Sequence, residues 1–279
     1  KENTATVYTG DAALMTAGPG VSTATVRLGA HLSAEADGAG NEGEMTKARV
    51  TFELFKSNNL TGAPDQIISG VAVDSNGDAL ATVNALAADI YNVNVRVDAA
   101  NQYWTANPIG IGVLNIVVPA NEQQSSGGGW VSDAASTNGK ANFGFNVKAA
   151  RKGEQVKGNL TLVFRGTDGF NYIVKSNAWQ DGYLQFFAEP GVSPAVYTRS
   201  GIKGRGNVQK VDPATGQTVA SLGNYSFEVF TMDGDLLTPR QSDAFSITVW
   251  DSNDQVWHQV GSRTSPVTLG GGNITNKSQ

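Results

Sequence analysis

Short runs in which apolar and polar residues alternate recur along the whole chain. In the clearest run, residues 91–97, apolar side chains occupy the odd positions, and Asn, Asn and Arg occupy the even ones. A period of two predicts strands with one buried face, and the window most like a helix, 79–89, keeps no apolar stripe at helical spacing. Clusters of Gly, Asn, Asp and Pro separate the runs, which is typical of antiparallel sandwiches built from short strands. Further alternating runs lie at 50–55, 160–164, 225–229 and 245–249.

Residues 121–129, with the sequence NEQQSSGGG, contain no apolar side chain and end in three glycines. A polar, Gly/Ser-rich stretch between two strand-rich regions indicates a domain boundary. The 279 residues leave room for two domains of ordinary size. We therefore expect an all-β protein of two antiparallel β-sandwich domains in tandem, at 1–120 and 129–279, joined by a Gly/Ser-rich linker at 121–128.

The composition argues against several classes of partner and site. A net charge of -5 without a dense Lys/Arg cluster argues against nucleic acid and anionic membrane surfaces. The absence of cysteine excludes disulfides, thiolate metal sites and Cys nucleophiles. No apolar run approaches the ~20 residues that span a bilayer, so we expect a chain that does not span a membrane. Because the chain starts at Lys1, we expect a processed or trimmed N-terminus, and the lack of a signal peptide does not indicate the cytosol.

The residues that could support catalysis are few. The chain has two histidines, His31 and His258, and neither lies near a Gly-x-Ser-x-Gly elbow. The acidic residues concentrate in turns, where Asp caps its own backbone. We therefore expect no enzymatic activity and no catalytic residues.

One turn offers oxygen atoms at alternate positions, as loops that bind hard cations do. In the sequence DSNGD these are Asp74, Asn76 and Asp78. The turn lacks the glycine at the sixth position and the distant bidentate Glu of an EF-hand loop. We expect no cofactor, with calcium at this turn as an alternative to a purely structural turn.

The stretch FSITVWDSNDQVWHQV, residues 245–260, predicts a hairpin around the turn at 251–254. With Val249 opposite Val256 and Thr248 opposite Trp257, His258 falls on the core face. Trp250 and Trp257 then become diagonal neighbours on the outer face, roughly 7–8 Å apart. Two indoles among Ser, Thr and Gln predict either a sugar-stacking platform or a face covered by other protein. Tyr103 and Trp104 form a second candidate platform.

The N-terminal half resembles the bacterial immunoglobulin-like domains that occur in tandem on secreted and surface proteins. The order and spacing of short elements carry the resemblance, and it implies an immunoglobulin-like sandwich over nearly all of 4–119. The matching elements are TVYTGD at 6–11, VRLGAHL at 26–32, ARVTFEL at 48–54, VDSNGDALA at 73–81, YNVNV at 91–95 and NQYW at 101–104.

The C-terminal half resembles post-COAP domains, β-domains at or near the C-terminus of exported bacterial proteins. The resemblance implies a compartment and an architecture rather than a reaction. Where the family pattern has an aromatic–Asp pair, this chain has Trp257 and His258. The matching elements are GGW at 128–130, GKANFGFNVK at 139–148, GNLTLVF at 158–164, GRG at 204–206, YSFEV at 225–229, DG at 233–234, DAFSITVWD at 243–251 and LGGGNI at 269–274.

These observations predict a non-catalytic, secreted or cell-surface protein that acts as a structural or adhesive element of a bacterial assembly. Strand-like segments at both ends, Thr4–Thr9 and Val267–Asn276, suggest self-association by pairing with a neighbour's sheet edge, although pairing within the chain explains them equally well. The partner would then be protein. The alternatives are a carbohydrate-binding module, with a glycan as the ligand, and an accessory region of a larger secreted enzyme.

Overall fold

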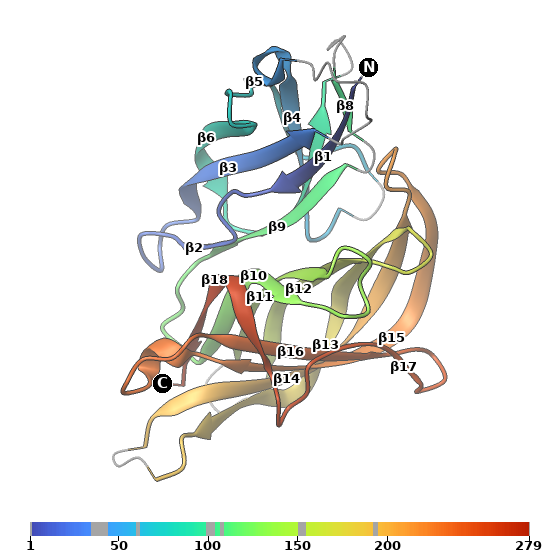
Figure 1. Ribbon diagram of the computed structural model, residues 1–279. Helices are drawn as coiled ribbons and strands as arrows, with labels where there is room; N and C mark the ends of the chain where they lie inside the picture. The colour runs from blue at the N-terminus through green and yellow to red at the C-terminus, as the bar shows by residue number, and fades with distance from the viewer. Residues whose placement is uncertain are drawn as a thin grey trace.

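The computed structural model describes residues 2–34, 44–59, 62–98, 104–106, 109–149, 155–191 and 195–278. These residues form eighteen strands and two short 3₁₀ turns, at Met45–Lys47 and Gly234–Leu236. Figure 1 shows the strands gathered into a first half, residues 2–118, and a second half, residues 124–278. The predicted all-β class is confirmed. In the described part of the chain, no helix is long and apolar enough to cross a membrane.

The first half is a pair of sheets that pack face to face. Its strands are β1 (Glu2–Tyr8), β2 (Ala13–Met15), β3 (Thr23–Ala34), β4 (Arg49–Lys56), β5 (Gln66–Ala72), β6 (Asp78–Ala87), β7 (Ile90–Val97), β8 (Trp104–Ala106) and β9 (Gly110–Val117). One sheet has the order β6-β3-β1-β8 and the other has the order β2-β9-β7-β4-β5. The prediction of antiparallel pairing fails at two places, because β1 pairs with β8 and β2 pairs with β9 in parallel.

Alternation along β4 and β7 places the core of the first half between its two sheets. On β4, Val50, Phe52 and Leu54 are fully buried, as the pattern predicts. On β7 the structure differs from a half-buried strand, because its polar face is covered too. Asn92 and Asn94 are only 4% and 3% exposed. The second half covers this polar face.

The second half is one sheet that closes on itself. Its strands are β10 (Gln124–Ser132), β11 (Lys140–Ala149), β12 (Val156–Arg165), β13 (Asn171–Ala188), β14 (Tyr197–Val211), β15 (Thr218–Met232), β16 (Ala244–Trp250), β17 (Val256–Val260) and β18 (Val267–Lys277). The order is β15-β14-β13-β12-β11-β10-β18-β16-β17, and an additional pairing of β15 with β16 closes the sheet. The interior holds a large apolar cluster, in which the rings of Phe143 and Phe245 stack with their centroids 3.9 Å apart.

The predicted linker at 121–128 is wrong from Gln124 onward. Residues 124–132 form β10, an interior strand between β11 and β18, and Gln124 to Gly129 are all buried. The glycines serve close packing, not flexibility. A Cβ atom on Gly128 would lie 2.6 Å from the Ala12 carbonyl oxygen, and one on Gly129 would lie 2.1 Å from the Gly271 carbonyl oxygen. Only residues 118–123 connect β9 to β10.

Both terminal strands pair within the chain. β1 lies between β3 and β8, and β18 lies between β10 and β16. The long pairings, of β1 with β3 and of β18 with β10, follow the alternative of intramolecular pairing. β8 pairs only with residues 2–4 of β1, and β16 pairs only with Val267 and Thr268 of β18. Self-association stays a prediction.

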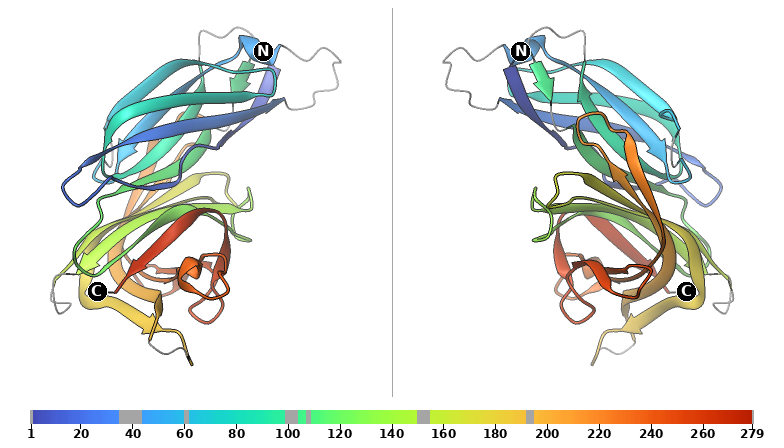
Figure 2. Two further views of the ribbon diagram at one scale, coloured as in Figure 1. Left: turned by 90° about the vertical axis from the view of Figure 1, so that its left-hand side faces the viewer. Right: turned by 90° about the vertical axis from the view of Figure 1, so that its right-hand side faces the viewer.

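The two halves share a continuous interface. An apolar seam joins Ile90 and Val113 of the first half to Val163, Ile173 and Val211 of the second. Beside it, Asn115 on β9 is fully buried, and its Nδ2 donates hydrogen bonds to the carbonyl oxygens of Gly127 at 2.8 Å and Phe145 at 2.7 Å. In the right-hand view of Figure 2, the orange hairpin between β14 and β15 rises beside the first half. The Ile109 N–H donates to the Pro213 carbonyl oxygen at the tip of this hairpin.

Candidate functional site

The hairpin of β16 and β17 has a different register from the predicted one. Val249 pairs with His258 and Trp250 pairs with Val256, so a bulge leaves Trp257 as the extra residue. The turn before the bulge is held by Asp251, whose Oδ1 accepts hydrogen bonds from the N–H groups of Asn253 and Gln255. The predicted pairings of Val249 with Val256 and of Thr248 with Trp257 are therefore wrong.

The bulge turns Trp257 toward the core. Its ring contacts those of Phe164, Tyr172 and Tyr225, with centroids 5.1 to 5.6 Å apart. Val256 takes the outward position and is 56% exposed. The structure thus corrects the outward platform of Trp250 and Trp257, because Trp257 packs against the core.

His258 lies on the core face, as predicted, but its partners were not foreseen. Its ring stacks on Phe164 with centroids 3.6 Å apart. Its Nε2 lies 3.2 Å from the Asp133 Oδ2, and both side chains are almost completely buried.

The second predicted platform is placed only in part. Tyr103 lies outside the described residues, and Trp104 belongs to β8, but its side chain is also outside the described part.

The side chains of the candidate calcium turn make contacts that a structural turn requires. Oδ1 of Asp74 accepts hydrogen bonds from the N–H groups of Asn76 and Asp78. Oδ1 of Asp78 lies 2.8 Å from Nδ1 of His31. Gly77 has a φ of +86° in this turn, a conformation that glycine adopts without steric cost. Among the residues that the structure describes, no group of three or more His, Cys, Asp or Glu side chains could hold a metal ion.

A cleft of about 680 Å³ lies between the two halves, beside the apolar seam. Its upper wall is the outer face of β4 and β7, and its lower wall is the face of β13 and β14. The β14–β15 hairpin and the loop between β4 and β5 close two further sides. The lining residues are Glu53, Phe55, Asn59, Gly62, Pro64, Asn92, Asn94, Arg96, Ile173, Lys175, Gln209, Val211 and residues 215–221.

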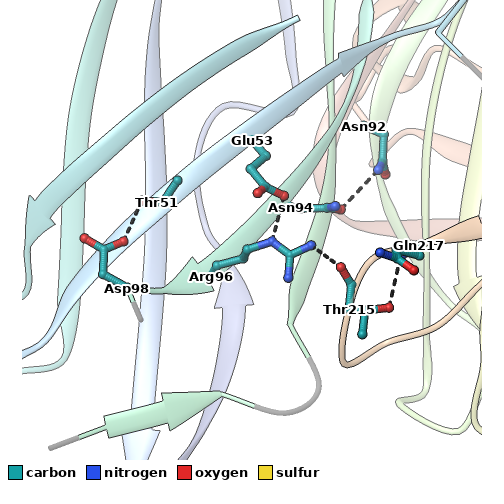
Figure 3. Close-up of polar contacts among 8 residues, drawn as sticks. All are labelled: Thr51, Glu53, Asn92, Asn94, Arg96, Asp98, Thr215 and Gln217. Atoms are coloured by element: carbon teal, nitrogen blue, oxygen red, sulfur yellow. Dashed lines mark hydrogen bonds and ion pairs between the residues drawn. The ribbon is translucent and has the colours of Figure 1, made fainter. Parts of the chain in front are cut away.

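A row of polar side chains runs along the upper wall (Figure 3). Nε of Arg96 donates to Oε2 of Glu53 at 2.7 Å, and its Nη2 donates across the cleft to the Thr215 carbonyl oxygen. Nδ2 of Asn92 donates to Oδ1 of Asn94. The Oδ1 of Asn92 is buried and accepts no hydrogen bond from any described residue. Arg96 therefore links the halves, while Asn92 holds a buried acceptor without a described donor in the wall of the cleft.

Lys175 reaches from the lower wall into the first half. Its Nζ donates to the carbonyl oxygens of Lys56 at 3.1 Å and Asn59 at 2.7 Å, and the residue is only 3% exposed. Burial lowers the pKa of this ammonium from its ordinary value to about 8, an effect that the charges of Asp89 and Asp65 partly offset. The ammonium is held by two carbonyl groups, which gives it a bridging role between the halves.

The sequence contains a signal for this cleft that the expected sites did not use. On β7 the outward positions are Asn92, Asn94 and Arg96, three polar side chains on one face of the strand. Such a row on a regular strand is an ordinary solvated face unless something covers it. The covering surface comes from β13 to β15, which the sequence pattern alone does not place opposite β7.

A second buried polar cluster, beneath β18, has a different character. Oδ2 of Asp233 accepts a hydrogen bond from the Asn276 N–H at 2.9 Å, and Oδ2 of Asp243 accepts one from the Ile274 N–H. Burial, with the nearby charges of Asp243 and Asp235, raises the pKa of Asp233 from 3.8 to about 6. Burial raises the pKa of Asp243 as well. These carboxylates hold the C-terminal strand in place.

The raised pKa of Asp233 gives a pH dependence of stability. Because the folded state holds this proton more tightly than the unfolded chain, the stabilising contribution is complete below about pH 4 and is lost as the pH rises through 6. We expect Asp233→Asn to flatten this fall and to raise the free energy of unfolding at pH 7 by about 2 kcal/mol. Urea titrations of both proteins between pH 4 and pH 7 measure this. A variant less stable than the parent at pH 7 would contradict the assignment.

No family model and no curated protein matches the chain.

Proposed function

We propose that the chain is a non-catalytic binding module of an extracellular or cell-surface assembly, and that the cleft between its halves holds the partner. One observation carries this proposal: a cleft of about 680 Å³ whose upper wall presents amide and guanidinium groups in a row. Such groups donate and accept hydrogen bonds in fixed directions, which suits recognition of a polar ligand.

The ionisable groups of the cleft favour binding over catalysis. Glu53 is paired with Arg96, and Lys175 donates to two carbonyl oxygens. None of the described residues that line the cleft is a histidine or a cysteine. A nucleophile activated by a neighbouring base, which covalent catalysis requires, is therefore not assembled by these lining residues.

The extracellular setting is supported by the sequence. The first half resembles immunoglobulin-like domains of bacterial surface proteins, and the second resembles post-COAP domains of exported proteins. The interface between the halves supports a structural or adhesive role, because Asn115, Arg96 and Lys175 each cross it with hydrogen bonds. Forces that act on one half would pass to the other through these contacts.

The cleft is tested with a glycan array and a randomised library of short peptides. We expect ligands from one of them to bind the protein and to bind Ser221→Trp at least about tenfold more weakly, because an indole at this exposed lining position fills the cleft. Ser252→Trp, at the exposed turn between β16 and β17, is the matched control and should bind normally. Failure of both libraries, or binding that Ser221→Trp leaves unchanged, would contradict the proposal.

A further inference from the structure

One part of β15 has a strand partner on one side only. Residues 218–222 of β15 pair with β14, through Val211↔Thr218, Lys210↔Ala220, Gln209↔Ser221 and Val208↔Leu222. On its other side β15 pairs with β16 only from Ser226 to Met232. No described strand pairs with the outer edge of 218–222. Unpaired N–H and C=O groups of this kind form a template for another strand.

The β15 segment with the free edge also lines the cleft. Four strands contribute alternate residues to the lining, which is what one face of a strand presents. On β7 these are Asn92, Asn94 and Arg96, and on β13 they are Ile173 and Lys175. The hairpin instead contributes the consecutive residues 215–221. Of these, Thr218 to Ser221 belong to the β15 segment whose outer edge has no described strand partner, so this segment borders the cleft.

The edge lacks the charged side chains and the proline that commonly prevent strand addition. Residues 218–222 have the sequence TVASL, which contains neither a charge nor a proline. Val219 and Leu222 are 53% and 39% exposed. One bulge, at Val219, lies within this segment, and a second lies between Leu222 and Tyr225, so the regular ladder runs from Ala220 to Leu222. The bulges limit the edge to a short segment, so a partner strand would also be short.

The upper wall fixes the chemistry of the partner's side chains. A strand added to β15 would lie under the polar row of β4 and β7, and its alternate side chains would point toward that row. Oδ1 of Asn92 is the buried acceptor without a described donor, so it suits a hydroxyl or amide donor. Arg96 and Glu53 already neutralise one another. The row therefore favours uncharged polar side chains on the partner.

We propose that the cleft binds a short extended peptide, with Ser, Thr, Asn or Gln at alternate positions, as an added strand on the free edge of β15. This inference rests on the proposed function, since it names the partner class of the same cleft. Backbone hydrogen bonds to 218–222 supply affinity, and the polar row on β4 and β7 supplies selectivity. A glycan would use the polar row without the backbone edge.

Peptides that bind the intact protein are selected from a randomised library. The best binder is then made in two N-methylated forms, one with its odd-numbered backbone amides methylated and one with its even-numbered amides methylated. Because only one edge of the added strand faces β15, we expect one set to weaken binding about tenfold or more and the other to leave it unchanged. Amide hydrogen exchange should slow at alternate residues within 218–222 when the peptide is bound.

A matched pair of variants locates the edge. Val219→Lys places an ammonium on the part of β15 that lines the cleft, and we expect it to weaken binding about tenfold. Leu80→Lys places an ammonium on β6, which is 74% exposed at this residue and is an edge strand of the other half, and should bind normally.

Each outcome separates this inference from the proposed function. A peptide that binds in the cleft with both N-methyl sets tolerated overturns strand addition and leaves the binding module intact. If only glycans bind, and Ser221→Trp weakens their binding, strand addition is again overturned and the binding module again stays intact. If neither library contains a ligand of the cleft, both proposals fail.

Discussion

Replacing Asn115 by aspartate is expected to destabilise the protein by about 4 kcal/mol at neutral pH. The Asn115 side chain is fully buried, and its Nδ2 donates to two carbonyl oxygens of the second half, at Gly127 and Phe145. The aspartate would place a charged oxygen against these two acceptors, at a position that is fully buried from solvent. Urea unfolding followed by tryptophan fluorescence measures the loss of stability.

Two controls isolate the cause of this effect. Asn115→Leu removes the donor without adding a charge, and it should cost about 2 kcal/mol because the two carbonyl groups lose their partner. Asn253→Asp makes the same chemical change in an exposed turn and should leave the free energy of unfolding nearly unchanged. The difference between Asn115→Asp and Asn115→Leu should shrink in acid, where the new carboxyl group is protonated and can donate again. Equal stability of Asn115→Asp and the parent at neutral pH would contradict the role of this contact.

The features that the sequence predicts well are those decided within a single strand. The alternation at 50–55 places Val50, Phe52 and Leu54 in the core. In the turn DSNGD, the side chain of Asp74 accepts a hydrogen bond from the backbone N–H of Asn76. Both follow from local geometry, because strand periodicity and turn capping depend only on neighbouring residues. The all-β class rests on the same local signals.

The features that the sequence does not predict depend on which distant segments of the chain pack against a strand. The glycines at 127–129 have the composition of a linker, yet they allow β10 to approach β18 and the loop at Ala12 closely. Trp257 has the spacing of an outward residue until one bulge shifts the register of β17. The polar row on β7 becomes one wall of a cleft only because β13 to β15 cover it. Composition and periodicity do not encode these tertiary contacts.

The two histidines of the chain allow one chemical change to be compared in two environments. Each imidazole lies beside an aspartate: His31 beside Asp78 at the surface, and His258 beside Asp133 in the core. We expect His258→Phe to lower the free energy of unfolding by about 3 kcal/mol, because the buried Asp133 carboxylate loses the nitrogen that faces it. Phenylalanine keeps a ring against Phe164, so the loss reports on the polar partner more than on packing.

His31→Phe is the matched control, and it should cost less than about 1 kcal/mol, because both side chains of that pair are roughly half exposed and water replaces the lost partner. Asp133→Asn tests the pair from the other side. In the double variant with His258→Phe the uncompensated charge is gone, while the amide oxygen can still accept from the Ala135 N–H as Oδ1 of Asp133 does now. The double variant should therefore be more stable than His258→Phe alone, a coupling that chemical denaturation of all four proteins measures. If the losses in free energy of unfolding of the two single variants simply add in the double variant, Asp133 and His258 contribute independently. The loss in His258→Phe would then come from altered packing around Phe164.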